Sequence, residues 1–389
     1  MPQNVTLDLE ELLEHFSTLE DPRSTINRHH LLSHVIIIAI MAVLGGATGP
    51  TSIAAWATLK SEYLNKLLTL PYGLPGKDVF RRVLMSLKPA VFQACFFNWL
   101  SALQAAAKIT TGVERPTFAV DGKTLRRSHD RKNKLGALHS VTVWASEYGL
   151  TLAQVATDQK SNEITAIPQV LALVELKGAI VTIDAMGTQT AIAKQIVDAE
   201  GDYILALKGN QETLHKAAIE YIDQQLEDDF AGLNAQKLET NEKGHGRVET
   251  RTYIQLPVPK DLPGASRWPG LLTLGIAILY CVKNGKTTAD IRYFISSLGV
   301  NVKQFAHSVR SHWGIENSCH WCLDVTYRED ESRIRELHLR ENFAWLNRFT
   351  LSLLKQHDVK KSVAMKRKMC GWNENYITEV ITGQGLSTR

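Results

Sequence analysis

Short apolar segments that alternate with helical patterns between residues 117 and 211 constrain the fold of this chain more than any other feature. Thr117–Val120 is an apolar run that ends at Asp121, and 139–157 holds two β-rich runs with a turn at Glu147–Gly149. The later elements alternate: a helix from about Asn162 to Leu176, the strand Ala179–Ile183 ending at Asp184, a helix over about Thr188–Ala199, the strand Tyr203–Leu207 and a helix from about Gln211. Adjacent antiparallel strands followed by helix-separated strands predict a mixed sheet with helices on its faces.

The order strand, strand, strand, helix, strand, helix, strand, helix is also the order of RNase H-like folds, an analogy of fold that does not prove an activity. β-Rich sequence resumes after Gly232, with strands expected at Arg247–Leu256, Leu272–Val282 and Asp290–Ser297. We therefore expect residues 232–299 to form a β-rich module inserted into the core. A long helix over roughly Lys303–Asp324 and another over about Glu336–Gln356 would complete that core.

The first 112 residues are expected to be helical. Apolar spacing and turn residues predict a helix that ends at Gly45–Gly46, one that begins at Pro50, a short one at Lys77–Lys88 and a longer one at Val91–Ala107. Such a set of short helices fits a DNA-reading bundle of helix-turn-helix type, or an ordinary bundle. The expected fold class is α/β: an RNase H-like mixed-sheet core, an inserted β-rich module and an N-terminal all-helical domain, with boundaries at 1–112, 113–231, 232–299 and 300–389.

Charge is distributed unevenly along the 389 residues, although the net charge is only +4. Residues 115–135 carry seven basic side chains against two acidic ones, 302–368 carry thirteen against eight, and 194–250 carry six against twelve. Two basic blocks around an acidic one suggest a polyanionic partner that binds particular surfaces, or merely solvated faces.

Apolar patterning and cysteine usage indicate the compartment. The longest apolar run, Val35–Leu44, has half of the roughly 20 residues that a bilayer span needs, so we expect no membrane partner. The first residues carry no basic-then-apolar export pattern, and five scattered cysteines do not suggest a disulfide framework. We expect a cytoplasmic protein.

Two aspartates and one glutamate are the candidate catalytic residues. Asp121 and Asp184 each follow an apolar strand, and they would come together if those strands were neighbours. Glu316 offers a third carboxylate, and His312 and His320 lie four residues to either side of it on one helical face. Carboxylates suit Mg²⁺, and two such ions about 4 Å apart serve phosphodiester chemistry. Taken singly, each carboxylate could instead cap a turn or lie on the surface.

Basic and amide side chains near these carboxylates are candidates for holding DNA phosphates. They are Lys123, Arg126, Arg127, Lys208, Asn210, Gln211, Arg247, Arg251, Arg310 and His312. Each of them could also be a solvent-facing residue without a ligand.

Two other interpretations concern the helix around Glu316. A zinc site could use His307, His312, Cys319, His320 and Cys322, but spacings of one and three within one helix do not close a tetrahedral cage, so packed helix residues are favoured. Trp313 and Trp321 lie eight residues apart and are expected to be core or core-edge anchors rather than platforms for stacking bases.

Several longer strings resemble one family throughout residues 20–355. They are DPRS (21–24), AVDGKTLRRS (119–128), KSNEITAIP (160–168), TIDAMGTQTAIA (182–193), DYILALKGNQ (202–211), GHGRVETR (244–251) and RSHWGIENSCHWCLDVTYRED (310–330). These strings resemble the DDE transposases of the ISAs type, the H-repeat-associated group.

The resemblance implies an RNase H-like core with an inserted β-rich domain, and Mg²⁺-dependent cutting at element ends followed by joining of the 3′-hydroxyl to target DNA. The family's catalytic aspartates fall on Asp121 and Asp184, and its glutamate falls on Glu316. Related insertion-sequence transposases carry Tyr-x2-Arg-x3-Glu-x6-Lys around that glutamate, whereas this chain has Val309, His312, Glu316 and Leu323 at those positions.

The function expected from the sequence is therefore that of an insertion-sequence DNA transposase with two Mg²⁺ (or Mn²⁺) ions held by the three carboxylates. Its partners would be double-stranded DNA, as terminal inverted repeats and as target, and a second copy or more on that DNA. An RNase H-like nuclease without strand transfer and a domesticated DNA-binding protein without cleavage are the alternatives.

Overall fold

The computed structural model describes residues 9–17, 19–26, 28–130, 132, 134–157, 163–244 and 246–383. Residues 1–8 of the expected helical domain, and Asn162, where a helix was expected to begin, lie outside the described residues. No helix in the described part of the chain combines the length and apolar character of a bilayer span.

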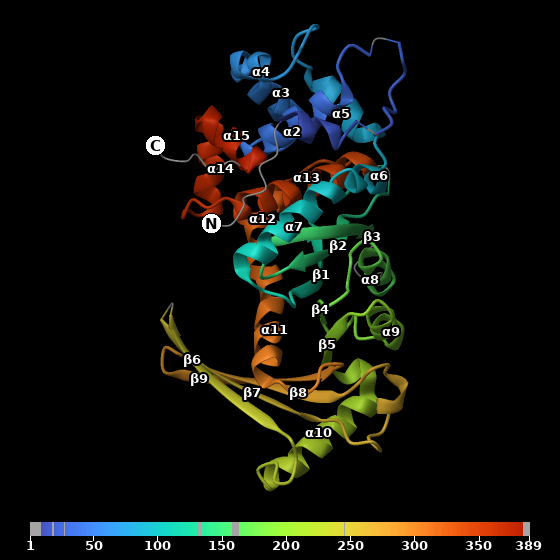
Figure 1. Ribbon diagram of the computed structural model, residues 1–389, viewed down its shortest axis with the longest axis vertical. Coiled ribbons are helices and arrows are strands. Elements are labelled where there is room, and N and C mark those ends of the chain that lie inside the picture. Colours follow the sequence, from blue (N-terminus) through green and yellow to red (C-terminus); the bar gives the residue numbers. More distant parts are fainter. Residues whose placement is uncertain are drawn as a thin grey trace.

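One nine-stranded mixed sheet runs through the molecule in the order β3-β2-β1-β4-β5-β9-β8-β7-β6 (Figure 1). Its strands are β1 Thr117–Leu125, β2 Leu138–Ala145, β3 Leu150–Thr157, β4 Ile180–Ile183, β5 Asp202–Leu207, β6 Gln236–Gly244, β7 Arg247–Pro257, β8 Thr273–Lys283 and β9 Lys286–Ser296. β1 pairs antiparallel with β2 and parallel with β4, and β4 pairs parallel with β5. The pair formed by β5 and β9 and all the pairs among β9, β8, β7 and β6 are antiparallel. The mixed α/β class expected from the sequence is confirmed.

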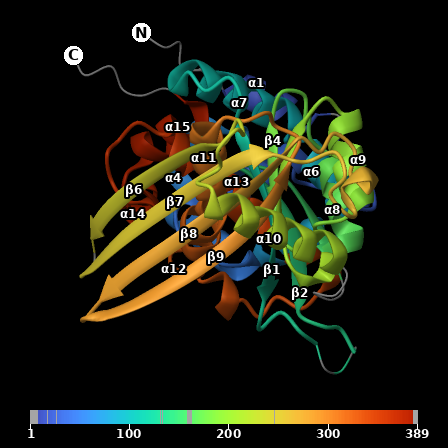
Figure 2. The same ribbon diagram turned by 90° about the horizontal axis from the view of Figure 1, so that it is seen from below.

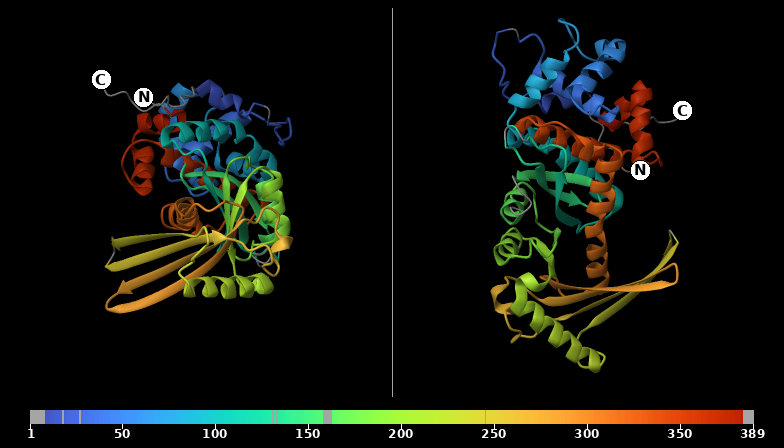
Figure 3. Two further views of the ribbon diagram at one scale, coloured as in Figure 1. Left: turned by 60° about the horizontal axis from the view of Figure 1, so that its bottom comes forward. Right: turned by 180° about the vertical axis from the view of Figure 1, so that it is seen from behind.

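The helices are α1 Leu9–Glu14, α2 Leu32–Leu44, α3 Pro50–Leu59, α4 Ser61–Leu67, α5 Lys77–Ser86, α6 Pro89–Ala94, α7 Phe97–Thr111, α8 Glu163–Leu171, α9 Thr190–Asp198, α10 Glu212–Glu227, α11 Val302–Gly314, α12 Trp321–Val325, α13 Leu337–Gln356, α14 Val363–Trp372 and α15 Glu374–Thr382. A π-helical segment, Ile315–His320, joins α11 to α12. Helices α8 and α9 cover one side of the sheet, and α11 and α13 lie on the other (Figure 3).

The first seven helices and the last three share one apolar core. That core includes Ile38 of α2, Phe96 beside α7, Phe349 of α13 and Ile377 of α15. Arg367 of α14 ties the two ends of the chain together, because its guanidinium donates to the carbonyls of Val43 and Ala47 and to Thr326 O. The expected boundary at residue 112 stays a prediction, but the helices before it pack on helices from the C-terminal region.

Strands β6 to β9 form a long twisted antiparallel ribbon that extends away from the rest of the sheet (Figure 2). Helix α10 packs Leu214 and Ile222 into the same apolar cluster as Ile254 and Leu274 of the ribbon. The far half of the ribbon is exposed on most positions of β8 and β9.

Four elements differ from the sequence expectation. Strand β1 continues past Asp121 to Leu125, because β2 pairs with it along its whole length although Asp, Gly and Lys are poor strand formers. Strand β6 was not expected, since its sequence QKLETNEKG is polar and mostly exposed and is held by backbone pairing to β7. The expected helix Val91–Ala107 is divided between α6 and α7, and the long helix around Glu316 contains the π segment.

Candidate active site

Strand register brings the two candidate aspartates side by side. Val120 of β1 pairs with Ile183 of β4 in parallel register, so the next residues, Asp121 and Asp184, lie on adjacent strands. Asp184 follows the last residue of β4, and its Oδ1 accepts hydrogen bonds from the backbone N–H groups of Met186 (3.1 Å) and Gly187 (3.2 Å). The chain turn after β4 thus fixes the second carboxylate at the strand end.

Glu316 reaches the same place from the opposite end of the chain. Helix α11 contacts β1 and β4, and the π segment that follows it contacts β1. A π turn closes i→i+5 hydrogen bonds, so residues four apart remain close to one face, and such turns are frequent at functional sites. Ligand atoms of Asp121, Glu316 and His320 all lie within 4.8 Å of one another, the single such group of three found in the described residues.

The electrostatic environment of these groups favours a cation. The pKa of Asp121 is raised to about 7: burial is the main cause, the nearby carboxylates of Glu316 and Asp184 add to it, and the Gly122 N–H partly offsets it. Burial also lowers the pKa of His320 to about 3 and that of His312 to about 4, so both imidazoles are neutral at pH 7. A positive charge among these groups would relieve the repulsion between the carboxylates.

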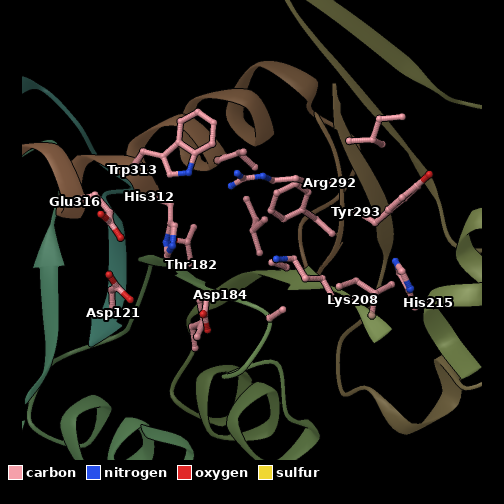
Figure 4. A pocket seen from close by; sticks show the side chains of 18 residues that line it. Asp121, Thr182, Asp184, Lys208, His215, Arg292, Tyr293, His312, Trp313 and Glu316 are labelled. Carbon is pink, nitrogen blue, oxygen red and sulfur yellow. The ribbon is translucent and has the colours of Figure 1, made fainter. Parts of the chain in front are cut away.

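A cavity of about 390 Å³ opens over the three carboxylates (Figure 4). Asp121, Asp184 and Glu316 lie towards one end of it, and Lys208 and Arg292 line its other part. The cavity therefore joins an acidic end that suits metal ions to a basic wall that suits a phosphate chain.

Trp313 lies on the wall of this cavity with three guanidinium groups around its ring. The Cζ atoms of Arg292, Arg310 and Arg251 lie 4.9, 5.7 and 6.0 Å from the ring centroid. The expectation that both tryptophans are core or core-edge anchors is wrong for Trp321, which is 58% exposed. Trp313 is half-buried.

Of the predicted phosphate contacts beyond β5, Lys208 and His312 line the cavity. Asn210 Nδ2 donates to Ala185 O (2.6 Å), and Gln211 Nε2 donates to Thr188 O (2.9 Å). These two amides hold the loop that carries Asp184. His312 lines the cavity, and its Nδ1 pairs with Thr182 Oγ1 at 2.9 Å.

Lys123, which was expected to contact a phosphate, lies in a buried network of carboxylates. Its side chain is buried, and its Nζ lies 2.6 Å from Asp324, 3.3 Å from Asp330 and 3.8 Å from Glu329. The expectation of an accessible phosphate contact does not fit this network, because three carboxylates already neutralise the ammonium group. Its neighbours Arg126 and Arg127 are exposed.

The arginines of the ribbon are paired with acidic residues. Arg251 is buried and bonds Glu249 and Glu242, Arg247 Nε lies 2.7 Å from Glu249, and Arg310 Nη2 lies 3.2 Å from Glu242. A second hollow is lined by Glu242, Gly244, Arg247, Glu249, Arg310 and Asn317. Arg247 and Arg310 remain partly exposed in these pairs.

The zinc interpretation is wrong for the residues described. Cys319 and Cys322 are buried in the apolar core that joins the two ends of the chain, and burial raises the pKa of Cys319 to about 12. The group of three potential metal ligands found in the described residues, Asp121, Glu316 and His320, contains neither cysteine.

The sequence analysis did not single out Arg292, nor the His139–Glu163 pair that packs against Gly122 of β1. Arg292 lies in a strand that was expected, but nothing in its spacing marked it. Beneath Gly122, His139 Nε2 pairs with Glu163 Oε1 at 2.6 Å in a buried ion pair. Glu163 belongs to the KSNEITAIP string, so the string itself was the available signal.

Comparisons with known proteins identify a family for most of the chain. The family described as "Transposase DDE domain" matches residues 113–354, and the family described as "DDE_Tnp_1-associated" matches 13–100. The H repeat-associated putative transposase YhhI of Escherichia coli K12 is 34% identical over 98% of this chain and 100% of its own length. Putative transposase YncI of E. coli O157:H7 is 38% identical over 96% and 95%.

A solved piggyBac transposase synaptic complex with hairpin DNA aligns over 97% of this chain and 78% of its own, at 9% identity and a TM-score of 0.39, too low a likeness to define the fold. The family matches and the mixed sheet define a transposase-type α/β protein. The chain belongs to the DDE transposase family. Its full-length relatives include H-repeat-associated transposases, which confirms the resemblance seen in the sequence.

Proposed function

We propose that this chain is an active DNA transposase that cuts the ends of an insertion sequence and joins the freed 3′-hydroxyl to target DNA. Asp121, Asp184 and Glu316 are its catalytic carboxylates. The observation that carries the proposal is that these three side chains, which lie up to 195 positions apart in the sequence, line one cavity. Ordinary capping or surface roles would not require the three to meet.

The site has the donors for two Mg²⁺ or Mn²⁺ ions. Asp121 lies between Asp184 on the next strand and Glu316 on the helical side, so it can contribute to both positions. Burial and the neighbouring carboxylates raise its pKa, and a bound cation would favour its ionised form. When bound, such ions stabilise charge on the attacking and leaving oxygens of a phosphodiester.

We further propose that β1 to β5 form an RNase H-like catalytic core. The order β3-β2-β1-β4-β5, with its antiparallel and parallel pairings, supports this. The ribbon β6 to β9, apart from the core-paired part of β9, is then the inserted module, and the domain limits are those expected from the sequence.

Double-stranded DNA is the proposed partner, in the forms of terminal inverted repeats and target. Lys208 and Arg292 on the cavity wall, and exposed Arg126, Arg127 and Arg310, are the proposed phosphate contacts. Transposition must bring two ends together, so we propose a dimer or larger assembly on DNA in the bacterial cytoplasm, associated with the nucleoid.

The test is a reaction with a supercoiled plasmid that carries the element with its terminal repeats, the purified full chain and Mg²⁺. We expect cleaved ends and covalent end-to-target joints with the wild type and neither with Asp184→Asn. Asp198→Asn, on the exposed Lys194 ion pair of α9, is the matched control and should keep both products. Cleavage without joints would support the nuclease, and metal-independent end binding without cleavage would support the domesticated binder; either result overturns the proposal.

A further inference from the structure

His320 is a buried histidine beside the candidate carboxylates that the three-carboxylate site does not use. It ends the π segment, four residues after Glu316, and is 8% exposed. Its Nδ1 lies 3.5 Å from Asp121 Oδ2, and its Nε2 has no hydrogen-bond partner among the described residues. Buried polar atoms normally have partners, so this ring requires an explanation.

A hydrogen bond to Asp121 does not provide that explanation. The separation of 3.5 Å exceeds the 2.7–3.2 Å that is typical of N–H···O hydrogen bonds. A charged pair is also unsuitable, because the ring lies close to the cationic Arg348 and Lys123. An imidazole nitrogen that lies beside two carboxylates is placed to bind a metal ion together with them.

The ligand geometry fits that partner. A nitrogen of His320 and oxygens of Asp121 and Glu316 lie within 4.8 Å of one another, whereas Asp184 stands outside this group. An ion that bridges the three needs only small side-chain movements, since metal–ligand distances near 2 Å place neighbouring ligand atoms about 3–4 Å apart.

We propose that His320 is a ligand of the ion held by Asp121 and Glu316, so that the two metal positions of the site differ in their donors. This inference rests on the proposed function. The position with the imidazole favours Mn²⁺ or a similar transition ion, because nitrogen donors suit such ions better than Mg²⁺. The position at Asp184 keeps oxygen donors and accepts Mg²⁺ readily.

His312 provides a matched control within the same cavity. It lines the cavity and is also neutral, but its Nδ1 pairs with Thr182 Oγ1, and it does not belong to the three-residue ligand group. A nitrogen signal from a bound ion should therefore depend on His320 and not on His312.

The experiment is pulsed electron paramagnetic resonance of Mn²⁺ bound to the full-length protein without DNA. We expect a nitrogen coupling in the wild type that changes when histidine is supplied as the ¹⁵N form. The coupling should disappear in His320→Gln and persist in His312→Gln. Titration should show Mn²⁺ affinity falling at least about tenfold in His320→Gln, with a smaller change for Mg²⁺.

Two results would overturn the proposal that His320 is a metal ligand, and only one of them would also overturn the proposed function. If Mn²⁺ binds in a manner that Asp121→Asn abolishes, but no histidine nitrogen couples to it, His320 is not a ligand and the proposed function stands. If Mn²⁺ binding does not depend on Asp121, both fall. The ¹⁵N comparison uses only wild-type protein, so the absence of a histidine coupling overturns the proposal even if His320→Gln does not fold. If a coupling is present, its persistence in His312→Gln excludes the other histidine that lines the cavity.

Discussion

Replacing Arg348 by methionine should cost this protein a large part of its stability. The Arg348 side chain is fully buried in α13, and its guanidinium donates to Glu329 Oε1 (3.0 Å), to Ser140 Oγ (3.1 Å), to Thr142 Oγ1 (3.3 Å) and to the carbonyl of Ala344 (3.1 Å). Methionine fills much of the same volume but removes the charge and all four hydrogen bonds.

The size of the stability loss follows from the Glu329 carboxylate, which loses its main partner in Arg348→Met. Glu329 is fully buried and would keep only the Asn347 amide at 3.3 Å and the Lys123 ammonium at 3.8 Å. Removing one partner of a buried ion pair costs about 3–5 kcal/mol because the other charge remains uncompensated. We expect the free energy of unfolding of Arg348→Met to fall by that amount.

The assay is urea denaturation followed by far-ultraviolet circular dichroism at pH 7.5. Lys194→Met, which breaks an exposed ion pair with Asp198, is the control and should lie within about 0.5 kcal/mol of the wild type. Adding Glu329→Gln to Arg348→Met should restore part of the loss, since no orphaned charge then remains. A loss below about 1 kcal/mol for Arg348→Met would refute the reasoning.

Three other perturbations follow from the structure. Gly122→Ala should lower the free energy of unfolding in urea by about 1–3 kcal/mol, because its Cβ would collide with the ion pair beneath it, whereas Gly299→Ala, with open space, should change little. The hydrogen bond that His307 Nε2 donates to Glu147 Oε1 raises the pKa of His307. The stability that this bond gives is therefore complete below the unfolded pKa and is lost as the pH rises through the folded pKa, and NMR titration of Glu147→Gln should show a lower His307 pKa. Arg367→Met should make the C-terminal helices more sensitive to limited proteolysis, because it removes their bonds to α2.

The sequence predicted the parts of the fold that local patterns encode. Strand β4 is a continuous apolar run with all four residues buried, and the Glu147–Gly149 turn lies between β2 and β3, with Gly149 in the left-handed region. The carboxylates Asp121 and Asp184 were found because each directly follows an apolar run, although β1 continues past Asp121.

The features that the sequence did not predict depend on long-range pairing. Strand β6 is polar, and only its backbone bonds to β7 make it a strand. Lys123 looked like a free cation, because the acidic residues that surround it come from a segment about 200 positions later. The π segment that places His320 beside Asp121 leaves no periodic signal, since it differs from an α-helix by a single inserted residue.

Single-turnover cleavage of an element end with Mg²⁺ tests the joint action of the three carboxylates most directly. Asp121→Asn, Asp184→Asn and Glu316→Gln should each lower the rate at least ~10³-fold while end binding is retained. The triple variant should be no slower than the slowest single one, because groups that act as a unit are not additive. Cleavage by Glu316→Gln at the wild-type rate would contradict the account.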